Sequence, residues 1–501
     1  MPRCEYEKYP DFQAEIEEID RNGISDALIN HIISKHAANR EYNLSMHKRY
    51  EALEGEVPIF NREPRFEEEN PVNNKINNDF VGEIIDFKTG YFAGKPAVYT
   101  YADTEESKED TGGEASRDEA SKALSDFVAR NNLWGVDMDV TKNAAIASYA
   151  GRQFYFDSEG NERVMALPGY ETIILSETDI TEPKYGIRYY KTQGLGGEEI
   201  WKAEFDDGKT IRFYEGNFAA LTEKTEKAIP NLFGLCAIQG IPNNTEMLGD
   251  AEKVLADIDA YDRVMSDVSN EVESFSNAYL AFENVDMGED EIKRGQKTGA
   301  FQYFTSGSQP GSIHFITKNI QDAFVEHHLD RLEENIYRFS KTPNLTSDQN
   351  FGSASGESLK FKLTGLETKC SLFQSKMQSA NAYMFKLLAS SWNKKRIAFD
   401  PLQCYVTYKR NFPENVLAEA QAVSALISTG YPKRKAYEKL PWVDDVDEIM
   451  ELIEEEKNGV ADLYENTPDD DEDLDGNPMT GNPEGFGMAG KEEIKEEQAQ
   501  A

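Results

Sequence analysis

The sequence predicts an α+β protein, because two residue patterns occupy separate parts of the chain. Between Gln153 and Tyr214, short runs of alternating apolar and polar residues are separated by Gly, Asp and Asn, a pattern typical of hairpins in an antiparallel sheet. Elsewhere apolar residues recur every three or four positions, as on one face of an amphipathic helix. The longest such stretch, from Glu357 to Lys394, contains no proline and predicts one helix roughly 55 Å long.

The apolar positions of this long helix advance in alternating steps of four and three residues. They are Leu359, Leu363, Leu366, Cys370, Phe373, Met377, Ala380, Met384 and Leu387. Two shorter stretches, Asp250–Ser276 and Gln321–Lys341, keep the same steps. Because adjacent packed helices require a stripe with a period near 3.5 residues, these stretches predict helices that pack either within one chain or repeatedly between subunits.

The first 240 residues predict a mixed α+β domain in which helices precede the sheet. Residues 103–120 carry almost no apolar side chains, so they predict a solvated loop. The other predicted elements are an amphipathic helix at Ala14–Lys35, a helix ending near Gly90, a strand at Ala97–Tyr101, and helices at Ala120–Asn131 and Val140–Tyr149.

An insert separates the two shorter helical stretches. Residues Asn277–Ile320 follow the order strand, short helix, strand, Gly/Ser/Pro turn and strand, which predicts a compact α/β module carried on two antiparallel helices. Thr342–Ser358 is rich in Gly, Ser, Asn and Asp and predicts a mobile loop. After the long helix we expect a strand at Gln403–Lys409, a helical region at Glu414–Lys457 interrupted at Ser428–Lys435, and a disordered acidic tail from Asn458.

The chain has 501 residues and a formal net charge of −39. This charge argues against a protein that wraps nucleic acid, because such proteins neutralise phosphates with clusters of Lys and Arg. It is compatible with a wall that surrounds DNA without gripping it. Four cysteines lie far apart in the sequence, as expected of free thiols in a reducing compartment. The N-terminus lacks the apolar core of a signal peptide, and no apolar run approaches the ~20 residues of a membrane-spanning helix, so we expect a soluble, intracellular protein.

Candidate catalytic and metal motifs are incomplete. The GKT at 208–210 matches the end of a phosphate-binding loop, but Ala203 stands where its first glycine is needed, and the segment fits a hairpin better. The D-x-D-x-D-G run at 471–476 opens like a calcium loop, but Asn482 replaces the acid at its twelfth position. The paired acids at Asp137–Asp139 have no identifiable partner, so we expect a surface turn there. We therefore predict no catalytic residues, no metal site and no cofactor.

Three stretches carry specific sets of residues. The first, 240–282, contains Ile241, Pro242, Asn243, Asn244, Asp250, Asp259, Tyr261, Ser266, Asp267, Asn270, Phe275 and Leu280. The second, 342–370, contains Ser355, Gly356, Leu359, Lys360, Leu363, Gly365, Leu366 and Glu367. The third is residues 80–100. Together they resemble, in this order, the stem, the tunnel loop with its following helix, and the N-terminal wing of portal proteins of tailed double-stranded DNA bacteriophages, of the siphophage type of Gram-positive hosts.

The resemblance implies a non-enzymatic subunit of a closed ring, with twelve copies in the virion at one vertex of the capsid. In that family, double-stranded DNA passes through the ring during packaging and ejection. The ring docks the terminase large subunit and a head–tail adaptor, and it contacts major capsid and scaffolding proteins. The implied location is the virion, after assembly in the host cytoplasm, with no membrane partner.

The resemblance also implies a division of the chain. Residues 1–245 and 358–412 form the wing, 246–276 and 321–341 the two-helix stem, 277–320 the small α/β clip, 342–357 the tunnel loop, 413–457 the helical crown, and 458–501 the disordered tail. The tunnel loop would present uncharged polar side chains to DNA, or would only link two helices; these side chains are Asn344, Thr346, Ser347, Gln349, Asn350 and Ser353. In the clip, a basic cluster would contact an acidic docking partner or form a solvated helix face; it consists of Lys293, Arg294 and Lys297.

Two other classes of protein are alternatives. A non-viral helical scaffold would use the same striped helices to form dimers or trimers, whereas a portal protein predicts a large ring. A nuclease or ATPase would reveal itself through metal-dependent cleavage or ATP turnover by the pure protein.

Overall fold

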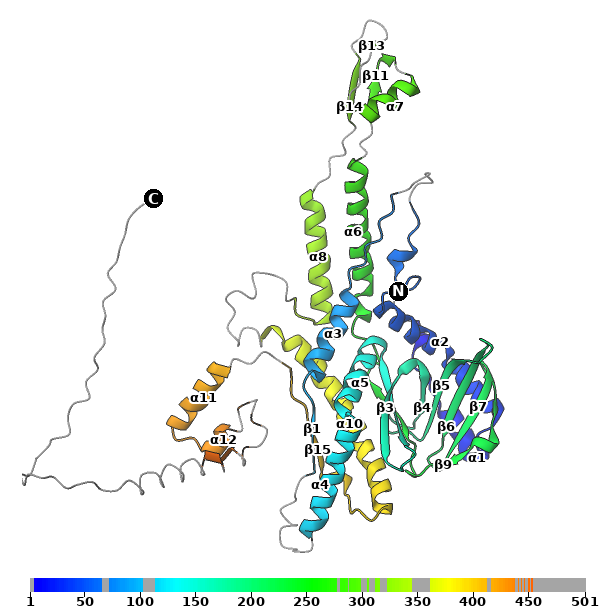
Figure 1. Cartoon of the computed structure of the whole chain (residues 1–501), viewed down its shortest axis with the longest axis vertical. Helices are drawn as coiled ribbons and strands as arrows, with labels where there is room; N and C mark the ends of the chain where they lie inside the picture. Colours follow the sequence, from blue (N-terminus) through cyan, green and yellow to red (C-terminus); the bar gives the residue numbers. More distant parts are fainter. Residues whose placement is uncertain are drawn as a thin grey trace, which may run out of the picture. The chain divides into compact units, whose positions relative to one another are not determined.

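The computed structural model describes residues 4–64, 72–101, 113–276, 280–286, 288–298, 304–305, 311–315, 322–344, 361–411 and 416–437, with short pieces between 440 and 453. The chain divides into two units, Met1–Pro413 and Glu414–Ala501, which we describe separately (Figure 1). Helices and antiparallel sheets together confirm the predicted α+β class. Within these ranges, every helix is too short or too polar to span a membrane.

Two N-terminal helices, α1 (Gln13–Asn22) and α2 (Asp26–Tyr50), replace the single helix predicted over Ala14–Lys35. The break has a local cause. Gly23 adopts a φ of 76°, which ends α1, because this left-handed region of backbone space favours glycine. The Ser25 side chain then caps α2 by accepting a backbone hydrogen bond from its first turn.

The largest sheet has antiparallel strands in the order β4-β5-β6-β7-β8, with β9 paired to β7. Helices α1 and α2 pack on it, and Ile33 and Phe205 lie buried between them. The predicted hairpin at 208–210 joins β6 to β7: Gly208 has a φ of 79°, and Asp207 Oδ1 accepts two backbone N–H groups of the turn. This confirms a turn in place of a phosphate-binding loop. The strands are β4 (Thr172–Leu175), β5 (Tyr185–Gln193), β6 (Glu199–Asp206), β7 (Thr210–Asn217), β8 (Ala220–Glu223) and β9 (Ile229–Pro230).

A second sheet brings a buried arginine against helix α5 (Leu133–Ala147). Arg152 on its central strand donates to Asp137 Oδ1 and to Asn381 Oδ1, both at 2.8 Å. The surface turn predicted at Asp137–Asp139 is therefore wrong: Asp137 is a buried helical residue. Burial raises the pKa of its carboxyl, and the Arg152 charge opposes that rise. The strands, in the order β10-β2-β3, are β10 (Ile238–Pro242), β2 (Tyr149–Phe156) and β3 (Glu162–Pro168).

The solvated loop predicted over residues 103–120 is wrong for residues 113–120. These residues form the first turns of helix α4 (Gly113–Arg130). The apolar face of α4 begins only at Ala120 and continues with Leu124 and Phe127, all of which are buried. Because the first turns of α4 are polar, composition alone did not distinguish them from a loop. Residues 103–112 lie outside the described residues.

The two strands predicted at Ala97–Tyr101 and Gln403–Lys409 are confirmed and pair with each other. Strand β1 (Val98–Tyr101) runs antiparallel to β15 (Cys404–Thr407). The helix predicted to end near Gly90 is α3 (Phe80–Ala93). The β1–β15 pair therefore connects the segment after α3 to the segment after the long helix.

The long helix α10 (Thr364–Lys394) lies in the core of the first unit. The continuous helix predicted from Glu357 is interrupted at Leu363: Phe361 and Lys362 are helical, Leu363 forms a turn, and α10 begins at Thr364. Residues 357–360 lie outside the described residues. The predicted stripe is confirmed by side chains that are each 0% exposed: Leu366, Cys370, Phe373, Met377, Ala380, Met384 and Leu387.

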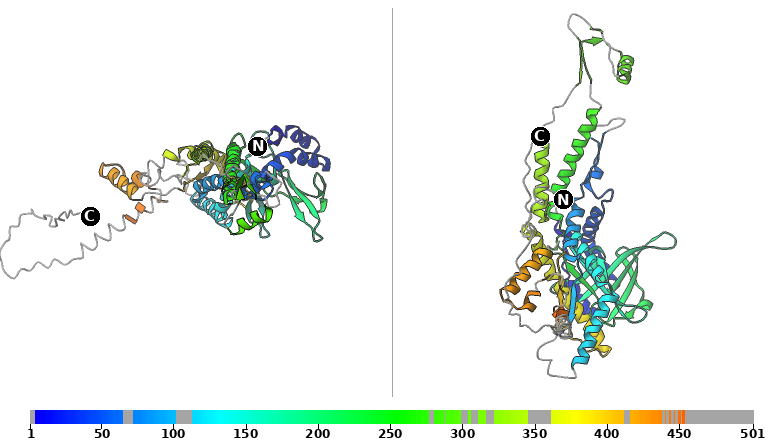
Figure 2. Two further views of the ribbon diagram at one scale, coloured as in Figure 1. Left: turned by 90° about the horizontal axis from the view of Figure 1, so that it is seen from above. Right: turned by 60° about the vertical axis from the view of Figure 1, so that its left-hand side comes forward.

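Helices α6 (Leu255–Ser276) and α8 (Asp322–Ser340) correspond to the two shorter striped stretches and lie side by side (Figures 1 and 2). Between them in sequence, the described residues of the insert form two strand pairs, β11 with β14 and β12 with β13. The predicted order of strand, helix, strand and strand is found, with β12 as an additional strand before the helix. Its elements are β11 (Leu280–Glu283), β12 (Val285–Asp286), α7 (Glu289–Thr298), β13 (Phe304–Thr305) and β14 (Ser312–Phe315).

The second unit contains α11 (Val416–Ser428) and α12 (Lys433–Tyr437). Gly430, with a φ of 86°, and Pro432 separate the two helices, so the interruption predicted at Ser428–Lys435 is confirmed. The predicted acidic tail and the calcium-like run at 471–476 lie outside the described residues.

Candidate functional site

The antiparallel helices α6 and α8 are well buried at one end and exposed at the other. Where they meet the rest of the first unit, Ile258 and Ile336 are at most 1% exposed. At the opposite end, Val272 is 63% exposed and Phe324 is 69% exposed. The apolar pattern of these helices thus extends beyond the partners that this chain supplies in its described residues.

An extended segment, residues 72–79, runs along α6 and forms a ladder of hydrogen bonds with it; we call this segment the strap. Four residues of helix rise about 6 Å and two residues of extended chain about 6.6 Å, so the two backbones stay in register. Alternate backbone N–H groups of the strap donate to side chains on one face of α6: Asn74 to Asn270 Oδ1 (2.6 Å), Ile76 to Ser266 Oγ (3.0 Å) and Asn78 to Asp262 Oδ1 (2.9 Å).

Ion pairs hold α6 to the N-terminal region as well. Arg49 of α2 pairs with Asp259, and Arg62 pairs with Asp267. These pairs and the strap were not predicted from the sequence. Polar residues recur every four positions along α6, which indicates a polar face that binds another segment. The sequence does not indicate which segment this is.

The base of α6 and α8 meets α3 and α10 in a charged cluster, which we call the joint. Asp250 Oδ2 lies 3.0 Å from Lys88 Nζ, and Asp250 Oδ1 lies 3.1 Å from Lys369 Nζ. Lys369 Nζ also donates to the Ser340 carbonyl at 2.8 Å, and Lys88 Nζ donates to Asn243 Oδ1. Burial raises the pKa of Asp250, but the two ammonium groups outweigh it and leave the pKa below its usual value. One carboxylate therefore links three helical regions.

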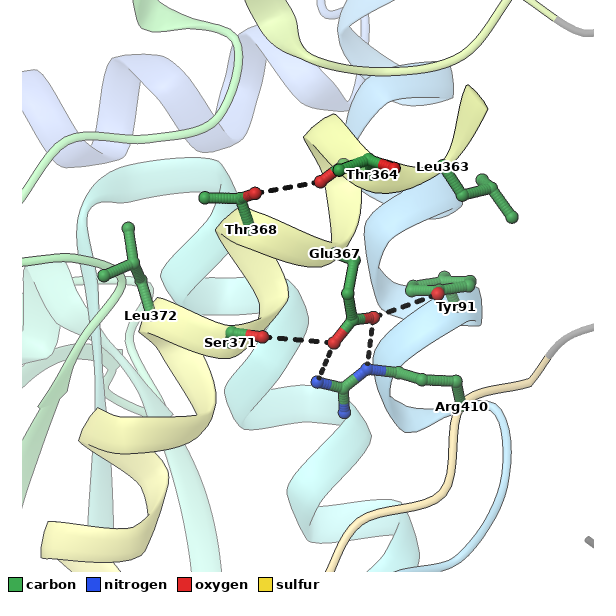
Figure 3. A pocket seen from close by; sticks show the side chains of 8 residues that line it. All are labelled: Tyr91, Leu363, Thr364, Glu367, Thr368, Ser371, Leu372 and Arg410. Atoms are coloured by element: carbon green, nitrogen blue, oxygen red, sulfur yellow. Dashed lines mark hydrogen bonds and ion pairs between the residues drawn. The ribbon is translucent and has the colours of Figure 1, made fainter. Parts of the chain in front are cut away.

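Figure 3 shows a second charged group, at the first turns of α10. Arg410 donates from Nε and Nη2 to the two carboxylate oxygens of Glu367, both at 2.9 Å, a bidentate geometry that strengthens the pair. Tyr91 and Ser371 donate to the same carboxylate at 2.9 and 3.1 Å. Burial raises the pKa of Glu367, but Arg410 outweighs it and lowers the net value. The group borders an open cavity of about 670 Å³ and ties α3, α10 and the segment after β15 together.

The described part of the chain contains only some of the predicted site residues. The Asn344 side chain donates to Glu333 Oε1 at 2.7 Å, so it is held against α8 where the predicted tunnel loop begins. Lys293 and Arg294 are exposed on α7, and Lys297 lies on the same helix. The other predicted DNA-facing residues lie outside the described residues: Thr346, Ser347, Gln349, Asn350 and Ser353. Their roles stay predictions.

Residues 29–462 match the model of the family described as phage portal protein, SPP1 Gp6-like. The chain belongs to this phage portal protein family. It is 22% identical over 427 residues to a portal protein of Bacillus phage SPP1, with 80% of each chain covered. It is also 25% identical over 465 residues to a portal protein of Clostridium phage phiCD119, covering 87% of this chain and 98% of that relative. These matches confirm the family resemblance seen in the sequence.

The structure gives physical roles to residues that carry this family resemblance. Asn243 and Asp250 form part of the joint, and Ser266 and Asn270 bind the strap. Glu367 pairs with Arg410. These polar residues thus connect elements of this fold. Within the described residues, no group of three or more His, Cys, Asp or Glu side chains is placed to hold a metal ion.

Proposed function

We propose that this chain is the subunit of a closed ring, twelve copies at one vertex of a bacteriophage capsid, through which double-stranded DNA is packaged and ejected. The observation that carries the proposal is the family match over residues 29–462. This span includes α6, the insert, α8 and α10. In the proposed ring, α6 and α8 form the stem, and the insert forms the clip. Residues 342–357 form the tunnel loop, residues 413–457 form the crown, and residues 1–245 and 358–412 form the wing.

The charge of the stem helices suits a channel that DNA slides through. Acids outnumber bases six to one in α6 and five to two in α8. Such walls offer few cations to hold phosphates, and tight DNA binding depends on those cations. A ring of subunits that each carry a net charge of −39 therefore resists adhesion of the DNA and lets it move in either direction.

The proposed contacts with DNA and partner proteins follow the predicted segments. The tunnel loop, 342–357, places uncharged polar groups beside the duplex, and these can touch phosphates without neutralising them. Lys293, Arg294 and Lys297 on α7 offer positive charge to the terminase large subunit or to a head–tail adaptor. The wing faces the major capsid and scaffolding proteins, and the assembled ring resides in the virion after assembly in the host cytoplasm.

Mass measurement and negative-stain imaging of the purified full-length chain test the ring. We expect particles with a central channel and a mass near twelve times 56.6 kDa. Replacing Gln349 and Asn350 with lysine should then slow DNA passage in a packaging assay, because each lysine adds a phosphate contact. Rings that package DNA at an unchanged rate would contradict the proposed position of this loop.

The alternative is a helical scaffold that oligomerises through the exposed ends of α6 and α8. It differs from the ring in stoichiometry, because striped helix pairs of this kind close as dimers or trimers. A dimer or trimer at all protein concentrations would favour the scaffold and contradict the portal ring.

A further inference from the structure

The joint holds more positive than negative charge. Lys88 (1% exposed side chain) and Lys369 (14%) share the single carboxylate of Asp250. Neutral oxygens accept their other hydrogen bonds, and the ring of Phe373 lies 4.7 Å from Lys88 Nζ. Burial lowers the pKa of Lys369, and Asp250 only partly opposes this effect. Buried charges are normally paired. Here two ammonium groups share one carboxylate, so one positive charge lacks a counter-ion among the described residues.

This surplus charge faces a cavity of about 120 Å³. Two further lysines, Lys253 and Lys341, line the cavity; both are exposed, and neither forms an ion pair within the described ranges. Glu246 is the second acid of the lining, so four lysines face two carboxylates. At roughly 30 Å³ per water molecule, the cavity has room for one carboxylate with part of its hydration.

Two exposed apolar side chains also line the cavity. Phe339 and Leu372 line it, and each is 54% exposed. Exposed apolar side chains around a charged centre are typical of the middle of a protein–protein contact. A phosphate on a stiff duplex could not reach Lys88 and Lys369, which are nearly buried, whereas a flexible Asp or Glu side chain of another protein could. The geometry therefore favours a protein carboxylate over DNA.

We propose that an Asp or Glu side chain of a second copy of this chain enters the cavity and supplies the missing negative charge. This inference rests on the proposed ring and identifies one point of contact between its subunits. A second copy is favoured because the chain carries 92 acids and 53 Lys and Arg residues. Copies with this composition repel one another, so their contacts should form where a cationic site accepts an acid.

The double variant Lys253→Gln/Lys341→Gln tests the proposal in the full chain. Both side chains are exposed, so the fold should persist. We expect the protein concentration at half-assembly, measured by sedimentation at fixed salt, to rise about tenfold, the effect of losing about 1.4 kcal/mol at each contact. The matched control is Lys122→Gln/Lys209→Gln, which removes two exposed lysines far from the cavity.

A second measurement reports directly on whether assembly covers the two lysines. Acetylation of Lys253 and Lys341, followed by peptide mass spectrometry, should slow when the wild-type protein assembles, while Lys122 stays reactive. Assembly of the double variant at wild-type concentrations would overturn this inference and leave the ring intact. Unchanged assembly with weaker DNA retention would assign these lysines to DNA instead. A wild-type chain that stays monomeric would overturn both the inference and the proposed ring.

Discussion

The long helix α10 and the stem pair α6–α8 share one apolar rhythm but differ in what covers it. Along α10, every stripe residue from Leu366 to Leu387 is 0% exposed, and the covering side chains come from the same unit. Along α6, the exposed fraction of the side chain rises from 1% at Ile258 to 63% at Val272. The period therefore identifies a helix with a packing face, but it does not tell which chain supplies the partner.

The difference follows from position in the fold. Helix α10 is contacted by α3, β10 and β15, so neighbours lie along its whole length. Helices α6 and α8 pack against α3 at one end. Beyond that end they contact mainly each other, the segment Pro58–Asn61 and the strap. In a pair of helices, each helix can cover one apolar stripe of the other. The apolar surface that stays exposed must be covered by other molecules. The comparison can be tested by substitutions in both regions.

The largest effect is expected for Phe373→Ala in α10. The side chain is fully buried and lies 5.0 Å from the ring of Phe92. Truncation should lower the free energy of unfolding by about 3–5 kcal/mol, because it leaves a cavity in a packed core. Urea denaturation measures this loss. The control is Gln378→Ala on the exposed face of the same helix, which should change stability by less than ~0.5 kcal/mol.

Asp250→Asn tests the charged contact at the joint, where α10 meets the base of the stem. The amide leaves two nearly buried lysines without a carboxylate, so we expect a loss of about 3 kcal/mol. Because the folded pKa of Asp250 is lowered, its stabilisation is complete above the unfolded pKa of about 3.9 and disappears as the pH falls through the folded value. The difference between variant and wild type should therefore narrow in acid. A constant difference down to pH ~2 would show that charge is not its cause. Asp126→Asn, at an exposed position outside this cavity, is the control.

Ser266→Ala should have a smaller effect, confined to the strap. It removes the acceptor for the Ile76 N–H and should cost about 1 kcal/mol. Hydrogen exchange at the Ile76 amide should become faster, while amides in α10 keep their protection. Equal acceleration in both regions would mean that the strap and α10 unfold together. Ser269→Ala, on the same helix and absent from the ladder, serves as the control.

Val272→Ala should change the stability of the single chain least, by no more than about 0.5 kcal/mol, because the side chain is mostly exposed. Assembly should be affected instead, and the protein concentration at half-assembly should rise. Sedimentation of Val272→Ala beside Ile258→Ala separates the two effects, since Ile258 is buried within one chain. A large loss of monomer stability in Val272→Ala would remove the contrast between stem and core.

Local patterns predicted much of the fold. The stripe of α10, the hairpin at 208–210 and the strands that became β1 and β15 all follow from residues close together in sequence. Two of the differences have local causes: Gly23 divides the first helical segment, and α4 begins in a polar stretch before Ala120. The prediction of a surface turn at Asp137 is wrong for a different reason: Arg152, which pairs with Asp137, lies on another element.

The sequence by itself determined the α+β class, the helical period, the acidic character and the family resemblance, because each depends on composition or on neighbours along the chain. Only the tertiary structure decided which charges meet. Lys88, Asp250 and Lys369 belong to three separate segments, and the strap binds α6 through residues far from it in sequence. Such contacts depend on how distant segments pack, and burial then gives each charge its energetic weight.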